Sequence, residues 1–173
     1  IEEFQTNRAY RANELYGQDM SITPEEFEKY KYDTYYSTES VMNYARTSFL
    51  RDVDRSNPET IAAVELLEAW DLGNQKENRG AALAMLTFEL TYDISDFTYD
   101  FESIYRRFLD SIDFLNSNYG RIDIQLGELQ VLKRGDFVAP LSGAPDALRA
   151  IYTKEDGDKR VSIAGDCFFQ FID

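Results

Sequence analysis

The chain has 173 residues, 43 % of them hydrophobic and 14 % aromatic, so it can bury the core of one ordinary domain and is not composed like a disordered protein. Its formal net charge of −14 argues against binding to nucleic acid or to anionic membranes, because both attract basic surfaces. The sequence contains no histidine, which excludes Ser-His-Asp and Cys-His catalytic sets and HExxH zinc sites.

Two short helices are predicted first. Residues 6–16 are helix formers. A second helix should begin at Thr23-Pro24-Glu25-Glu26, where Thr23 caps, proline suits the first position and Glu26 completes a capping box. We expect this helix to reach about Tyr32, with Phe27 and Tyr30 facing inward.

Four longer amphipathic stretches follow, each with apolar residues at helical spacing. They cover residues 37–53, 57–73, 80–90 and 102–115. Trp70, near the end of the second stretch, is most simply explained as a core residue. Residues 93–100 alternate between aromatic and acidic side chains and fit either a short strand or a loop.

The character of the chain changes after Gly120. Residues 129–132 read as a short strand and 138–146 as a loop. Asp156-Gly157 favours a hairpin turn between strands 148–153 and 160–164, and 167–172 reads as a buried strand. The sequence therefore predicts an α+β fold with a helical lobe over residues 1–120 and a β-strand segment over residues 121–173.

The β-strand segment is too short to cover both faces of its own strands. We therefore expect it to be completed by parts of a longer chain. The missing initiator methionine and the abrupt ends agree with a processed chain or a fragment. No apolar run approaches the ~20 residues that a membrane-spanning helix needs.

Arg8 and Arg11 are the first candidate functional residues. They lie one helical turn apart and could present positive charge to a substrate anion or an oxyanion. The alternative is a structural ion pair, for instance between Arg11 and Glu14.

The remaining candidates have simpler explanations. Asp93, Asp96 and Asp100 lack the spacing and glycine of a calcium loop and fit a solvated acidic face. The pair Glu25 and Glu26 could act in glycoside hydrolysis only in principle, because so acidic a chain offers many such pairs. Cys167 has no histidine or nearby cation to lower its pKa, so it is better explained as a buried filler than as a nucleophile.

Several segments, in a fixed order, resemble the penicillin acylase (penicillin amidase) family. They are Asn7-Arg8-Ala9-Tyr10-Arg11, Ile22-Thr23-Pro24-Glu25-Glu26-Phe27, Tyr32-Asp33-Thr34, Leu67-Glu68-Ala69-Trp70-Asp71, Gly80-Ala81-Ala82-Leu83, Gly127-Glu128-Leu129-Gln130-Val131-Leu132-Lys133-Arg134-Gly135, Pro140-Leu141-Ser142-Gly143-Ala144-Pro145-Asp146 and Ala164-Gly165-Asp166. The tail is similar to the branch that includes acyl-homoserine lactone and aculeacin acylases. The sequence departs from the family at Ala12, at Asn78-Arg79-Gly80 and at Cys167-Phe168.

The resemblance implies a fragment of an αββα N-terminal-nucleophile hydrolase that cleaves the amide bond of N-acylated small molecules. A serine exposed by self-cleavage attacks, and its own α-amino group serves as the base, so no histidine is needed. The nucleophile, the oxyanion asparagine and the calcium ligands of the family would lie upstream of Ile1. The active-site arginine of the family falls on Arg8, with Arg11 as the weaker match.

Further expectations follow from the same resemblance. The chain by itself should be inactive and should hold no cofactor. Its partners would be a small-molecule amide substrate and the rest of the same precursor, in the periplasm or outside the cell. The alternative from a different class is a non-catalytic, acidic helical interaction or binding module.

Overall fold

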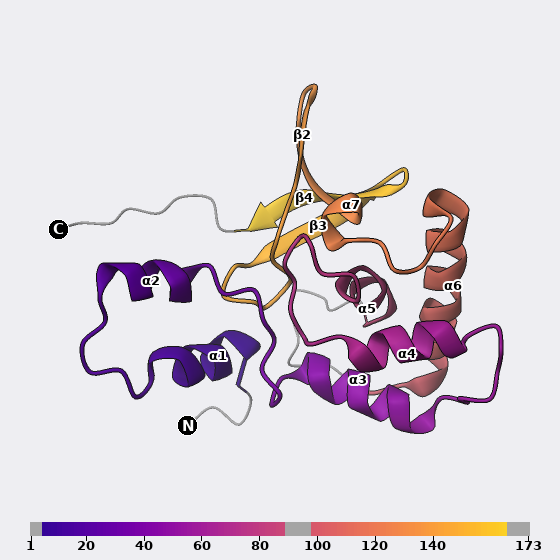
Figure 1. Cartoon of the computed structure of the whole chain (residues 1–173), viewed down its shortest axis with the longest axis horizontal. Coiled ribbons are helices and arrows are strands. Elements are labelled where there is room, and N and C mark those ends of the chain that lie inside the picture. The colour runs from indigo at the N-terminus through magenta and orange to yellow at the C-terminus, as the bar shows by residue number, and fades with distance from the viewer. Residues whose placement is uncertain (1–4, 89–97, 166–173) are drawn as a thin grey trace.

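The computed structural model describes residues 5–88 and 98–165 and has an α+β fold. Within these residues a helical lobe precedes a four-stranded sheet (Figure 1). The helices are α1 (Asn7–Tyr16), α2 (Pro24–Lys31), α3 (Val41–Asp52), α4 (Ile61–Ala69), α5 (Ala81–Phe88), α6 (Phe101–Tyr119) and α7 (Leu126–Leu129). The strands are β1 (Gln130–Arg134), β2 (Phe137–Pro140), β3 (Ile151–Asp156) and β4 (Lys159–Gly165).

Helices α3, α4, α5 and α6 form the body of the molecule. Phe49 of α3 is fully buried, and its ring lies 5.1 Å from that of Phe108 on α6 and 6.0 Å from that of Phe88 on α5. The same core cluster includes Leu126 of α7 and Ala144 of the loop before β3. Apolar packing therefore joins residues from the helical lobe and from the segment after residue 120.

The longest helix, α6, confirms the clearest helical prediction. Its inward face carries Ile104, Phe108 and Leu115, all buried. The helix ends at Gly120, whose φ of +71° is the left-handed conformation that glycine adopts without a steric penalty.

The sheet has the strand order β2-β1-β4-β3. β1 and β2 form one antiparallel hairpin, β3 and β4 form another, and β1 pairs with β4 in parallel. A hairpin turn joins β3 and β4 as predicted, but its two residues are Gly157 and Asp158, one position later than Asp156-Gly157, and Gly157 has a φ of +65°. The β1–β2 hairpin projects from the body, as Figure 1 shows.

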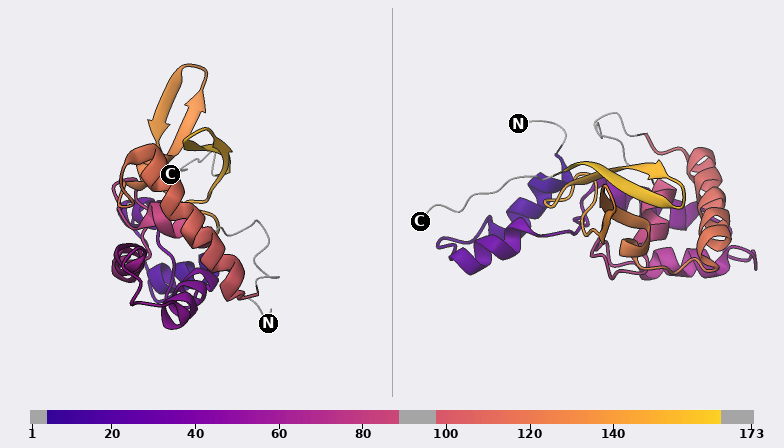
Figure 2. Two further views of the ribbon diagram at one scale, coloured as in Figure 1. Left: turned by 90° about the vertical axis from the view of Figure 1, so that its right-hand side faces the viewer. Right: turned by 90° about the horizontal axis from the view of Figure 1, so that it is seen from above.

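Helices α1 and α2 form an N-terminal arm that extends away from the body (Figure 2). Thr23 and Glu26 make the predicted capping box at the start of α2. The prediction that Phe27 faces inward is wrong, because its side chain is 49 % exposed. Tyr30 is partly buried, and its ring lies 5.8 Å from that of Tyr16 on α1. The two helices thus pack on each other and add nothing to the apolar core among the described residues.

Several predicted boundaries need correction. Helix α3 starts at Val41 rather than at residue 37, because Ser40 caps it. Leu129 closes α7 instead of opening a strand. The loop predicted for residues 138–146 contains strand β2, whose apolar residues and edge proline suit an outer strand. Leu90, residues 93–97 and the predicted strand 167–172 lie outside the described residues.

No helix in the described part of the chain is long and apolar enough to span a membrane.

Candidate functional site

The candidate site lies where the first turn of α1 meets the loop before β3. Asn7, the first residue of α1, is buried and makes three side-chain hydrogen bonds to segments far away in sequence. Its Nδ2 donates to the carbonyl oxygens of Tyr35 (3.2 Å) and Asp146 (3.0 Å), and its Oδ1 accepts from the backbone N–H of Ser37 (2.7 Å). Asn7 therefore fixes the start of α1 against two loops.

Asp146 supplies a buried carboxylate to the same helix start. Its Oδ2 accepts the backbone N–H of Asn7 at 2.7 Å, which satisfies one of the free donors of the first helical turn. Asp146 has a φ of +59°, a conformation that aspartate tolerates better than most residues. Burial raises the pKa of this carboxyl, while the Asn7 N–H and the Arg8 side chain act in the opposite direction.

Arg8 lies beside Asp146 but keeps half of its side chain in solvent. Its Nε is 3.6 Å from Asp146 Oδ1, and its Nη2 donates to the Tyr152 hydroxyl at 3.3 Å. The side chain is 48 % exposed. Within the described residues, no hydrogen bond involves Arg8 Nη1, so this end of the guanidinium can still bind an anionic or carbonyl group.

Arg11, one turn further along α1, forms ion pairs that stabilise the fold. Its Nε and Nη2 donate to the two carboxylate oxygens of Asp33 at 3.0 and 2.7 Å, and its Nη1 donates to Glu14 at 2.6 Å. The hydrogen bond to Asp33, followed by the one to Glu14, raises the pKa of Arg11 against the effect of burial. The interpretation of Arg11 and Glu14 as an ion pair is confirmed, with Asp33 as a further partner.

The arrangement thus gives different roles to two arginines that their spacing alone could not distinguish. Both carry a permanent positive charge. Arg11 is 17 % exposed and clamps α1 to the segment after α2, whereas Arg8 is 48 % exposed and contacts Asp146 through Nε and Tyr152 through Nη2. Such a guanidinium can stabilise negative charge on a reacting group or depress the pKa of a neighbouring amine.

The other sequence candidates lie elsewhere. Asp100 occupies the N-cap position of α6 without a side-chain capping bond, and its carboxylate accepts a hydrogen bond from the Ser103 hydroxyl at 2.6 Å, which is the main reason for its lowered pKa. Trp70 is buried, as predicted for a core residue, and its indole N–H donates to the Gly73 carbonyl oxygen. Asp93, Asp96 and Cys167 lie outside the described residues. Among the residues that are described, no group of three or more Cys, Asp or Glu side chains could hold a metal ion.

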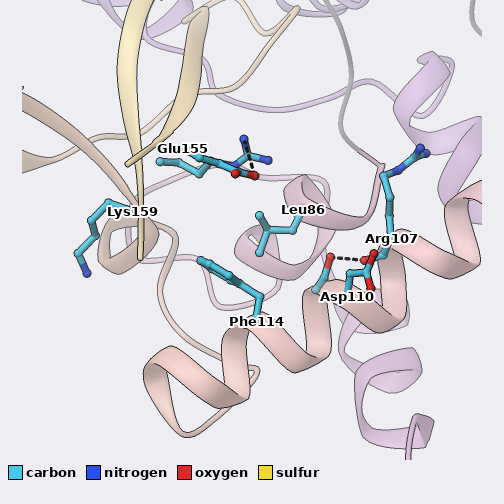
Figure 3. A pocket seen from close by; sticks show the side chains of 8 residues that line it. Leu86, Arg107, Asp110, Phe114, Glu155 and Lys159 are labelled. Atoms are coloured by element: carbon cyan, nitrogen blue, oxygen red, sulfur yellow. Dashed lines mark hydrogen bonds and ion pairs between the residues drawn. The ribbon is translucent and has the colours of Figure 1, made fainter. Parts of the chain in front are cut away.

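A hollow of about 270 Å³ lies between α6 and the β3–β4 hairpin (Figure 3). Leu86 and Phe114 point toward its middle, and Arg107 and Glu155 lie at its sides. Three of its charged groups have partners: Arg107 donates to the Thr87 carbonyl oxygen, Glu155 pairs with Arg160 at 3.7 Å, and Lys159 donates to the Glu128 carbonyl oxygen at 2.9 Å. None of the residues quoted for the family resemblance lines this hollow.

Sequence reasoning missed the roles of Asn7, Asp33 and Asp146, although all three lie in the segments quoted for the family resemblance. Their side chains act over separations of 22 to 139 residues, which no local pattern encodes. The sequence does contain one indication of a turn at Asp146, because an aspartate after Gly143-Ala144-Pro145 suits a turn with positive φ.

Comparison with models of known protein families finds no match, and comparison with curated proteins finds none either.

Proposed function

We propose that this chain is part of an amide hydrolase of the penicillin acylase type and that Arg8 is the residue it contributes to the active site. The nucleophile, an N-terminal serine, would come from outside these residues. The substrate would be the amide of an N-acylated small molecule, and the setting the periplasm or the cell exterior.

The observation that supports the proposal is the difference between Arg8 and Arg11. A residue with an active-site role should be oriented by its neighbours and still have an unused donor. Arg8 contacts Asp146 and Tyr152, and no hydrogen bond among the described residues involves its Nη1. In addition, the segments around Asn7-Arg8 and Pro145-Asp146, both part of the family resemblance, meet in space through hydrogen bonds 139 residues apart in sequence.

The chemistry assigned to Arg8 is electrostatic. A guanidinium near the serine would disfavour protonation of the serine's α-amino group and keep it available as the base. The same charge would stabilise the oxyanion that forms when the amide carbonyl is attacked. Neither role needs a histidine.

The test uses the full precursor protein and the variant Arg8→Gln. We expect hydrolysis of acyl-homoserine lactone or phenylacetamide substrates, or self-processing, to fall by at least about tenfold, as when one oxyanion-stabilising group is removed. Arg8→Lys should retain part of the activity, because it keeps the charge but loses the guanidinium geometry.

Arg55→Gln is the matched control, because Arg55 is also 48 % exposed and also pairs with a carboxylate, that of Glu68. Its activity should equal that of the unmodified precursor. Full activity and full processing in Arg8→Gln would contradict the role proposed for Arg8, which would then be only a partner in an ion pair with Asp146. A precursor that hydrolyses none of these amides and does not process itself would favour the non-catalytic binding module. The 173-residue chain itself should show no turnover, and measurable turnover would contradict the placement of the nucleophile outside it.

A further inference from the structure

A second hollow, of about 480 Å³, lies between the end of α2, the loop after α4 and the loop between β2 and β3. Its lining includes Lys29, Tyr32, Tyr35, Lys76, Ser142 and Arg149. The volume falls within the range of small-molecule sites.

Backbone hydrogen bonds fix the walls of this hollow to one another. Asn74 N–H donates to the Thr34 carbonyl oxygen (3.2 Å), and Gly143 N–H donates to the Asn74 carbonyl oxygen (2.8 Å). Arg149 N–H donates to the Asp33 carbonyl oxygen at 2.9 Å. Three segments that are far apart in sequence therefore form a preorganised cavity.

The charge of the lining is opposite to that of the chain. Lys29, Lys76 and Arg149 contribute three positive charges, in a protein whose net charge is −14. The carboxylate in the lining, Asp33, is already neutralised by Arg11. Lys76 has a weak ion pair with Glu77 at 3.8 Å. The hollow is thus a local positive site in an acidic molecule.

Arg149 is positioned to bind a ligand. Its guanidinium lies 5.1 Å from the centre of the Tyr32 ring, and its Nε donates to the Ser142 carbonyl oxygen at 3.2 Å. In the part of the chain that the structure describes, no hydrogen bond involves its Nη1 or Nη2. The Ser142 hydroxyl oxygen accepts the Lys76 backbone N–H at 2.9 Å, which leaves the hydroxyl proton to donate.

We propose that this hollow binds a small organic oxyanion, a carboxylate or a phosphate monoester, attached to an apolar body. The oxyanion would lie between Arg149, Lys76 and the Ser142 hydroxyl, and the apolar body would lie against Tyr32, Tyr35 and Pro140. This inference does not depend on the proposed acylase activity.

The test is calorimetric titration of the 173-residue chain with 3-phenylpropionate, phenyl phosphate, inorganic phosphate and the neutral 3-phenylpropionamide. At least one of the two phenyl anions should bind with a dissociation constant below about 1 mM, and the amide should bind at least about tenfold more weakly. Inorganic phosphate should bind more weakly than phenyl phosphate, because it lacks the apolar body. The stronger of the two phenyl anions identifies the class of oxyanion.

Two substitutions locate the binding. Arg149→Gln should weaken anion binding by about tenfold or more, the loss expected for a charged hydrogen bond. Arg149 also contacts Tyr32 and Ser142, so a second variant, Lys76→Gln, is needed. Among the described residues the Lys76 side chain makes one weak ion pair, and its replacement should weaken binding severalfold. Lys133→Gln, on the β1–β2 hairpin, is the control for Lys76→Gln because the exposure of the two lysines is 49 % and 47 %.

Three results would overturn the inference. They are equal binding of the amide and the acid, no binding of either phenyl anion below about 1 mM, and equal binding by Lys76→Gln and Lys133→Gln.

Discussion

The N-terminal arm and the body are held together by different kinds of interaction. In the body, rings from α5 and α6 pack around the fully buried Phe49 of α3. The arm, α1 and α2, adds no residue to this core among the described residues and is attached through the hydrogen bonds of Asn7 and the ion pair of Arg11 with Asp33. Apolar packing is non-directional, whereas these polar contacts require a single orientation of α1. The arm can therefore be placed accurately without being part of the core, which suits a segment that presents Arg8.

The largest loss of stability is expected from a substitution in the body. Phe49→Ala removes a ring with no solvent exposure and should lower the free energy of unfolding by about 3–5 kcal/mol, through lost burial and a cavity. Denaturant unfolding followed by circular dichroism measures this change. Phe137→Ala, at an exposed position on the β1–β2 hairpin, is the control and should leave the midpoint nearly unchanged.

A smaller loss is expected where the arm is attached. Asn7→Ala leaves the buried N–H of Ser37 and the carbonyl oxygens of Tyr35 and Asp146 without their side-chain partner, at a cost of about 2–3 kcal/mol. Amide hydrogen exchange should accelerate in α1 more than in α6.

Asn118→Ala is the control for Asn7→Ala, since the exposed Asn118 makes one hydrogen bond to its own helix. If Asn7→Ala destabilised the protein no more than this control, the polar attachment of the arm would be disproved.

The smallest effect is expected within the arm. Thr23→Ala removes the capping box of α2 and should lower the stability of that helix alone by about 1 kcal/mol. Hydrogen exchange at the first amides of α2 measures it, and Thr23→Ser should restore the protection. Faster exchange throughout α3 and α6 would show instead that the arm and the body unfold as one unit.

The sequence predicted the features that depend on local patterns. Periodic apolar residues located the helices of the body, and Thr23, Glu26 and Gly120 marked helix ends correctly. It failed at Phe27, where helical periodicity implied a buried face, because α2 packs on α1 rather than on the core. The sequence does not predict strand β2, because Pro140 indicates a loop, although an edge strand accommodates proline.

The candidate site could be predicted only in part. Spacing placed Arg8 and Arg11 one turn apart but could not distinguish their roles. The difference arises from Asp33 and Asp146, which reach α1 from separate loops and depend on the tertiary fold. The positive hollow around Arg149 was not predicted for the same reason, since its lining residues come from several distant segments.

The most direct test of the account compares the unfolding free energies of Arg8→Gln and Arg11→Gln in the 173-residue chain. Arg11→Gln leaves the mostly buried Asp33 carboxylate without its bidentate partner and should destabilise the protein by about 2–3 kcal/mol. Arg8→Gln removes a half-exposed side chain with a 3.6 Å ion pair and should cost less than about 1 kcal/mol. Equal losses in the two variants would contradict the account, because Arg8 would then be a structural residue like Arg11.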